Sequence, residues 1–100
     1  MSVEVHLRGA TVEIWAYFKN WEGDYASPDQ GAKVSYLKDP DGTAQVEDTA
    51  MTEDDTGKWV YRYDTESDGV VGWWRYRCIG TDGAVSPKYS IKDGSFELKA

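Results

Sequence analysis

The feature that most restricts the fold of this chain is the alternation of apolar and polar residues at every second position. Between residues 11 and 19, one face of an extended strand carries Val12, Ile14, Ala16 and Phe18. We expect this face in the core, because side chains of a strand point alternately to opposite sides. Helical spacing of apolar residues is hard to find anywhere in the chain. The pattern therefore predicts an all-β protein.

The same alternation marks the other expected strands. They lie at about 3–7, 32–38, 43–47, 58–64, 71–79 and 95–99. The residues that share one face of each strand are Val3, Val5 and Leu7; Val34 and Tyr36; Ala44 and Val46; Trp59, Tyr61 and Tyr63; Trp74, Tyr76 and Cys78; and Phe96 and Leu98. We expect the aromatic rings among them to supply a large core, since each buries roughly 150–250 Å².

Turn-forming residues separate these strands. Residues 20–31 predict a long loop, and turns are expected at 39–42, 65–69 and 80–83. Pro87 is expected to confine any strand near 84–91 to an edge or an interrupted position, because proline lacks an N–H. One hundred residues correspond to one domain, spanning 1–100. The prediction is an antiparallel β-sandwich or barrel of seven to eight short strands.

Composition argues against most enzymes and against nucleic-acid binding. The chain has 11 basic and 18 acidic residues, a net charge of −7, whereas nucleic-acid affinity depends on basic contacts to phosphate. Its single histidine, His6, is expected to be exposed, and its single cysteine, Cys78, to be a small buried hydrophobe. We therefore expect no catalytic residues, no cofactor and no metal site. No membrane segment or secretory signal is expected either, which favours synthesis in the cytoplasm.

The acidic residues are interpreted as solvated charge. Residues 22–69 hold 13 acids and 4 bases, whereas residues 70–100 hold 3 acids and 5 bases. The pairs Asp39/Asp41 and Asp54/Asp55 are expected in turns or at strand ends open to water, and not in a catalytic cleft. An improvised calcium site from loop acids such as Asp24, Asp29 and Asp41 stays open as an alternative.

Aromatic residues off the core face are the candidate binding residues. Trp15 and Tyr17 share the outward face of one strand, Trp21 and Tyr25 lie in the long loop, and Trp73 alternates with the core residue Trp74. Tryptophan and tyrosine are enriched at protein interfaces, which favours partner contact. Two alternatives stay open: a satellite cluster with Trp21 folded back on Tyr17, and stacking on sugars.

Four segments carry a family resemblance. They read YFKNWEGDYASPDQGAKVSYLKDPDGT at 17–43, DDTGKWVYRYDT at 54–65, GWWRYRCIGTDGA at 72–84 and DGSFEL at 93–98. Their order resembles small immunoglobulin-like structural proteins of tailed bacteriophages and prophages. The matching residues are Asp39, Pro40, Gly42, Asp55, Gly57, Tyr61, Gly72, Trp74, Arg75, Tyr76, Arg77, Gly80, Thr81 and Phe96. The chain departs from the family pattern at Trp59, at Asp82-Gly83 and at Pro87.

The resemblance implies an immunoglobulin-like β-sandwich and a structural role in the virion, as a head decoration, neck or tail component. The expected partners are capsid, neck or tail proteins and further copies of the chain. The alternative function is a carbohydrate-binding or surface-adhesion module that uses the exposed aromatics. An inhibitor or accessory subunit of a host enzyme is a third hypothesis. Fold-level likeness alone is weak support for any of them.

Overall fold

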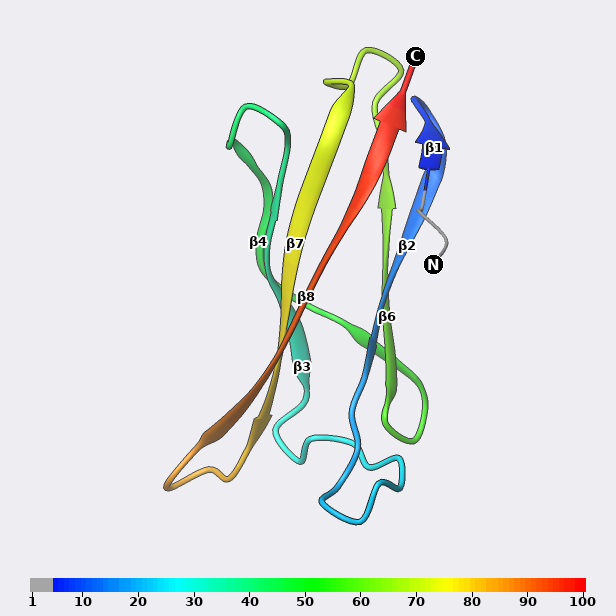
Figure 1. Ribbon diagram of the computed structural model, residues 1–100. Coiled ribbons are helices and arrows are strands. Elements are labelled where there is room, and N and C mark those ends of the chain that lie inside the picture. The colour runs from blue at the N-terminus through cyan, green and yellow to red at the C-terminus, as the bar shows by residue number, and fades with distance from the viewer. Residues whose placement is uncertain (1–4) are drawn as a thin grey trace.

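A computed structural model describes residues 5–100 and contains two β-sheets and no helix within that range (Figure 1). The eight strands are β1 (Val5–Leu7), β2 (Thr11–Tyr17), β3 (Ala32–Lys38), β4 (Ala44–Ala50), β5 (Thr52–Asp55), β6 (Lys58–Asp64), β7 (Gly72–Asp82) and β8 (Lys88–Lys99). The two sheets pack face to face as a sandwich. The all-β prediction is therefore confirmed, and the expected strand count of seven to eight is met.

The larger sheet has the order β1-β8-β7-β3-β4, and the smaller one has the order β2-β6-β5. Neighbouring strands are antiparallel except β1 and β8, which run parallel, with Val5 opposite Glu97 and Leu7 opposite Lys99. The prediction of a wholly antiparallel sandwich is wrong at this one pair. The expected inward position of Val3 lies outside the described residues.

The chain crosses from the larger to the smaller sheet at Met51, between β4 and β5 (Figure 1, green). Met51 is buried, and its backbone N–H donates to the carbonyl of Ala32 at 3.0 Å. The sequence predicts no strand between residues 47 and 58, but β5 forms there with all four side chains exposed. This crossing ties the two sheets together through the backbone.

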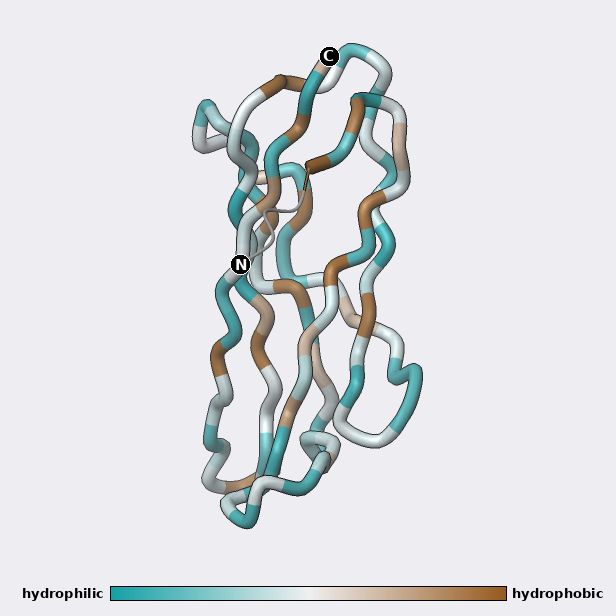
Figure 2. Tube along the Cα trace, turned by 45° about the vertical axis from the view of Figure 1, so that its right-hand side comes forward, coloured by the Kyte–Doolittle hydropathy of each residue, from teal (hydrophilic) through white to brown (hydrophobic). Residues whose placement is uncertain are grey.

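The core lies between the sheets and uses the alternation expected from the sequence (Figure 2). The predicted face of β2 is buried along its whole length, as are Trp74 and Cys78 of β7 and Phe96 and Leu98 of β8. The remaining aromatic residues predicted for the core, Trp59, Tyr61, Tyr63 and Tyr76, are partly buried and pack against it. The aromatic core is confirmed.

Two inward faces differ from the prediction. Tyr36 was expected inside, but Leu37 is fully buried instead and Tyr36 is only half-buried. The pairing of β3 with β7 shifts between Val34 and Tyr36, so that Ser35 is passed over and the alternation changes phase. In β1, His6 is the half-buried residue and packs edge-on against Phe96, while Val5 and Leu7 are exposed. The prediction of an exposed His6 is therefore wrong.

The last hairpin is also longer and more regular than predicted. Strand β7 continues through Gly80 to Asp82, so the expected turn at 80–83 is displaced to the residues before β8. Gly80 therefore lies inside the strand. Its position requires glycine, because a Cβ there would be 2.6 Å from both the Phe18 ring and Pro28. Pro87 directly precedes β8 and interrupts nothing: residues 88–99 form one continuous strand.

Trp74 provides a direct test of the core. Its side chain is 2% exposed and stacks on Phe96 with ring centroids 5.8 Å apart. Trp74→Ala is expected to lower the free energy of unfolding by about 3–5 kcal/mol, because the buried ring is lost and a cavity is left in its place. The matched control is Trp73→Ala, because Trp73 is the adjacent residue and 51% exposed; it is expected to cost less than about 1 kcal/mol. Urea denaturation measures both. A cost below about 1 kcal/mol for Trp74→Ala would remove Trp74 from the core.

Candidate functional site

The structure brings three of the five predicted contact residues together on the smaller sheet. Trp15 and Tyr17 lie on the face of β2 that is turned away from the core, with ring centroids 6.1 Å apart and planes inclined by 19°. Tyr25 reaches them from the long loop and meets Tyr17 edge-on at 6.2 Å. Tyr17 and Tyr25 are about half exposed, so the rings form a surface that a partner can touch.

Two lysines complete this surface. The Nζ atoms of Lys19 and Lys58 lie 4.9 and 4.8 Å from the centre of the Tyr25 ring, within cation–π range. Lys58 is opposite Tyr17 in the β2–β6 ladder, and Lys19 forms an isolated bridge with Tyr25. We call Trp15, Tyr17, Lys19, Tyr25 and Lys58 the aromatic–lysine patch. It combines flat rings with positive charge on a chain whose net charge is −7.

The long loop holds Tyr25 in place through contacts with the β5–β6 turn. The Phe18 N–H donates to the carbonyl of Gly57 at 2.7 Å, and the Ala26 N–H donates to the carbonyl of Phe18 at 3.0 Å. The Ser27 hydroxyl accepts from the Gly57 N–H at 2.8 Å and donates to Glu53. Gly57 has φ +74°, and a Cβ there would lie 2.5 Å from the Phe18 oxygen. Only glycine fits this close approach.

The tip of the loop is shaped by one asparagine. The side-chain oxygen of Asn20 accepts from the backbone N–H groups of Glu22 and Asp24, both at 3.0 Å. The backbone N–H of Asn20 donates to the Asp24 carbonyl. Trp21 projects from this tip and is 92% exposed. The alternative in which Trp21 folds back on Tyr17 is therefore wrong; Tyr25 occupies that place instead.

Trp73 lies apart from the patch, on the outward face of the larger sheet. Its neighbours along β7 on that face are Arg75 and Arg77, and Glu97 is its partner on β8. Trp73 therefore belongs to a different surface from the patch residues.

Arg77 is held in place on the same face. It donates two hydrogen bonds to Asp93, at 2.7 and 3.1 Å, and lies over the Tyr36 ring at 5.8 Å. The hydrogen bonds with Arg77 lower the pKa of Asp93, and those with Asp93 raise the pKa of Arg77. Asp93 lies opposite Arg77 on the neighbouring strand, so this ion pair joins β7 to β8.

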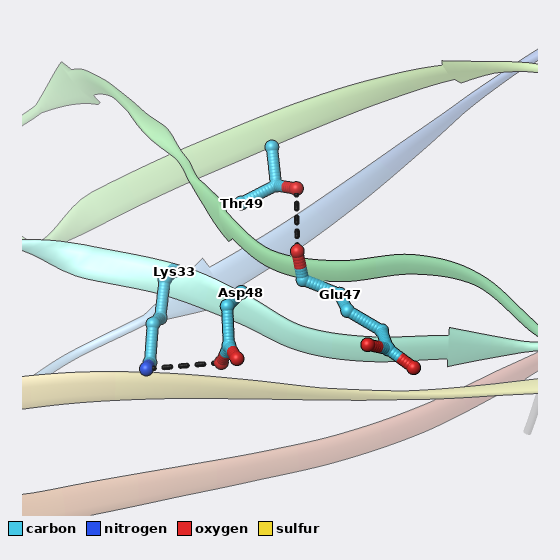
Figure 3. A network of polar contacts seen from close by, with 4 residues as sticks. All are labelled: Lys33, Glu47, Asp48 and Thr49. Carbon is cyan, nitrogen blue, oxygen red and sulfur yellow. Dashed lines mark hydrogen bonds and ion pairs between the residues drawn. The ribbon is translucent and has the colours of Figure 1, made fainter.

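Strand β3 meets β4 through a second ion pair beside a small cavity. Lys33 donates to Asp48 at 3.0 Å, and the Thr49 hydroxyl donates to the carbonyl of Glu47 at 2.9 Å (Figure 3). The cavity measures about 310 Å³, and besides the ion pair its walls include Met51, Trp59 and Ile79. An apolar hollow with one ion pair at its rim offers no acid–base or nucleophilic pair.

Two buried groups, Asp39 and Cys78, have structural roles. Asp39 is buried, contrary to the prediction of a solvated turn residue, and its carboxylate accepts from the Asp41 and Thr43 N–H groups at 3.0 Å and from Gln45 at 3.1 Å. It therefore closes the β3–β4 turn. Burial raises the pKa of Cys78 to about 12, so this thiol is not a nucleophile at neutral pH.

Within residues 5–100, no group of three or more His, Cys, Asp or Glu side chains is placed to hold a metal ion. The carboxylate of Asp29, one of the acids considered for calcium, accepts from the Gly83 N–H, and that of Asp82 accepts from the Asp29 N–H. The described part of the chain has no helix long and apolar enough to span a membrane.

Comparisons with protein-family models, with curated proteins and with solved structures find no match to this chain. The fold defines the class as a two-sheet β-sandwich with a five-stranded and a three-stranded sheet. Within this class, the exposed aromatic–lysine patch is the candidate site, and its flat rings and ammonium groups are suited to contact with a partner.

Gly57 tests how the loop positions the patch. Gly57→Ala is expected to cost at least about 2 kcal/mol of unfolding free energy, because left-handed backbone strain and a clash with Phe18 add together. Gly42→Ala is the matched control: φ is +86°, but nothing lies within 4 Å of its added Cβ. It is expected to cost about 1 kcal/mol. Urea denaturation of the two variants decides, and equal costs would contradict the close approach of Gly57 to Phe18.

The Arg77–Asp93 pair predicts a pH dependence of small size. Because the folded pKa of Asp93 is lowered, its stabilising contribution is present above the unfolded pKa and is lost as pH falls through the folded pKa. Asp93→Asn should therefore lower the urea midpoint at pH 7 and converge with the parent chain in acid. Both groups are exposed, so the difference is expected to shrink in high salt. A difference that grows on acidification would contradict this assignment.

Proposed function

We propose that this chain is a non-enzymatic structural protein of a tailed-phage virion, and that it binds a neighbouring virion protein through the aromatic–lysine patch. The observation that carries the proposal is the surface cluster of Trp15, Tyr17 and Tyr25, with the ammonium groups of two lysines over the Tyr25 ring. Rings already packed against one another lose little side-chain entropy on binding, which suits them to anchor an interface. The partner is a capsid, neck or tail protein, and further copies of the chain join it in the particle.

An immunoglobulin-like topology is part of the same proposal. Its support is the assignment of consecutive strands β2 and β3 to different sheets, together with β1 running parallel to β8 at the edge of the larger sheet. The motif residues quoted from the sequence also occupy structural positions: Asp39 and Gly42 close a turn, Gly57 anchors the loop, and Trp74 and Phe96 fill the core. A small rigid sandwich with a contact surface suits a virion component.

The charge of the patch indicates what the partner presents. Lys19 and Lys58 both direct their ammonium groups at Tyr25, so the patch is positive at its centre, while β5 beside β6 carries three exposed acids at Glu53–Asp55. A partner surface with an acidic group facing the lysines, and an apolar group facing Trp15 and Tyr17, would complement it. A uniformly basic surface such as a nucleic-acid-binding face would not.

Particles assembled from the genes that flank this one supply the test. We expect those genes to encode capsid, neck or tail proteins, and we expect the purified chain to sediment with particles assembled without it. Tyr17→Ala is expected to weaken this binding at least tenfold, since buried interface aromatics are frequent hot spots. Trp73→Ala is the matched control, because Trp73 is comparably exposed but lies on the opposite sheet, and it should bind like the parent chain.

Three outcomes would overturn the proposal: flanking genes unrelated to virions, no sedimentation with particles, or equal loss of binding in the two variants. The carbohydrate-binding alternative is favoured by one observation, the 92% exposure of Trp21 beside the patch. It predicts a glycan-array signal that Trp21→Ala abolishes while particle binding is absent from the start.

A further inference from the structure

The side of β8 that faces away from β7 is largely unpaired among the strands that the structure describes. Strand β7 pairs with β8 along its whole length, from Gly72↔Leu98 to Asp82↔Lys88. On the other side, β1 covers only Glu97–Lys99. Among residues 5–100, no strand pairs with that side between Lys88 and Phe96, and the side chains of residues 88–93 are all exposed. Such an edge is a template for pairing with another strand.

One hydrogen bond gives the direction of the backbone groups along this edge. The Arg8 N–H donates to the Lys99 carbonyl at 2.9 Å, so the backbone N–H and C=O of Lys99 point toward β1 and away from β7. In an antiparallel pair, alternate residues direct their N–H and C=O groups to opposite sides. The β7–β8 register has no shift, so the alternation holds back to the hairpin turn. Tyr89, Ile91 and Asp93 therefore present their N–H and C=O groups to the free side.

On the proposed function, in which the chain associates with copies of itself, we propose that two copies pair antiparallel through the free edges of β8, with a two-fold axis beside Ile91. In this arrangement Ile91 lies opposite Ile91 of the second copy, and Tyr89 lies opposite Asp93 on either side of the axis. Three hydrogen-bonded pairs form, and the two larger sheets become one continuous sheet across the dimer.

The charges along β8 select this register. A two-fold axis perpendicular to the sheet passes beside one residue, which then faces its own copy. An axis beside Ser90 would place Lys88 opposite Lys92, and an axis beside Lys92 or Asp93 would place that charged residue opposite itself. Like charges directly opposite are destabilising. The lysines and Asp93 therefore exclude three neighbouring registers.

A fourth register is excluded by backbone chemistry. An axis beside Tyr89 would place Ile91 opposite Pro87, which has no N–H to donate. The register centred on Ile91 brings no like charges together, since Ser90 then faces Lys92. It also buries Ile91, which is 52% exposed in the single chain, against an identical side chain. Charge and the missing N–H of Pro87 together thus favour the register centred on Ile91 over those centred one or two residues to either side.

Disulfide cross-linking tests the register. Ile91→Cys places two thiols opposite each other with Cα atoms about 5.5 Å apart, within disulfide reach. In the same dimer the two copies of position 89 lie four residues apart along the strands, about 13 Å. Under mild oxidation Ile91→Cys is expected to give mainly covalent dimer on a non-reducing gel, and Tyr89→Cys mainly monomer. Tyr89 is the more exposed residue, so random collision would favour the opposite result.

Sedimentation equilibrium over about 10 µM to 1 mM tests the edge without cysteine. The mass of the parent chain is expected to rise toward that of a dimer. Ile91→Lys places like charges on the axis and should raise the dissociation constant at least tenfold. Val85→Lys is the matched control, because Val85 is 95% exposed in the hairpin turn and outside the pairing; it should associate like the parent chain.

A monomeric mass at every concentration, or equal cross-linking of the two cysteine variants, would overturn the inference. Such a result leaves the aromatic–lysine patch and its binding to particles unaffected, because the patch lies on the other sheet. Conversely, loss of particle binding in Tyr17→Ala does not change the sedimentation of the free chain. The two proposals therefore fail separately.

Discussion

The contact on which the rest of the structure depends is the packing of Trp74 between the two sheets. Its ring stacks on Phe96 from the neighbouring strand and meets Tyr63 from the opposite sheet at 5.9 Å. His6 extends the same row by packing edge-on against Phe96. Leucine and isoleucine are scarce in this chain, so aromatic rings supply the volume that aliphatic side chains supply in other cores. Rings also have preferred mutual orientations, which helps to hold the two sheets in one alignment.

Much of this arrangement was predictable, because side-chain alternation is a local property of an extended backbone. It identified the buried faces of β2 and β7 correctly, and in β6 it placed Trp59, Tyr61 and Tyr63 against the core. It missed Val60, which lies on the other face of β6 and is nevertheless buried. It failed where a neighbouring strand overrides local geometry. At Ser35 a register shift makes Leu37 and not Tyr36 the inward residue. At Gly80, a residue typical of turns is required inside a strand, because Phe18 and Pro28 pack against its backbone.

The candidate site was predictable in its parts and not in its assembly. Trp15 and Tyr17 face outward because they alternate with the buried residues of β2. Lys19 continues the same alternation, so its place beside them was predictable from the sequence. Lys58 joins only through the pairing of β2 with β6, and Tyr25 only through loop contacts to Gly57. Such contacts join residues more than thirty positions apart, and single-residue preferences carry no information about them.

The parallel pairing of β1 with the end of β8 has a mechanical consequence. Tension between the two ends of the domain pulls the start of β1 and the end of β8 in opposite directions along their common axis. The backbone hydrogen bonds that join Val5–Leu7 to Glu97–Lys99 then carry this load simultaneously, in shear. An antiparallel pair in this position would break its hydrogen bonds one at a time. A sandwich closed in this way resists stretching along its length better than its short first strand would indicate.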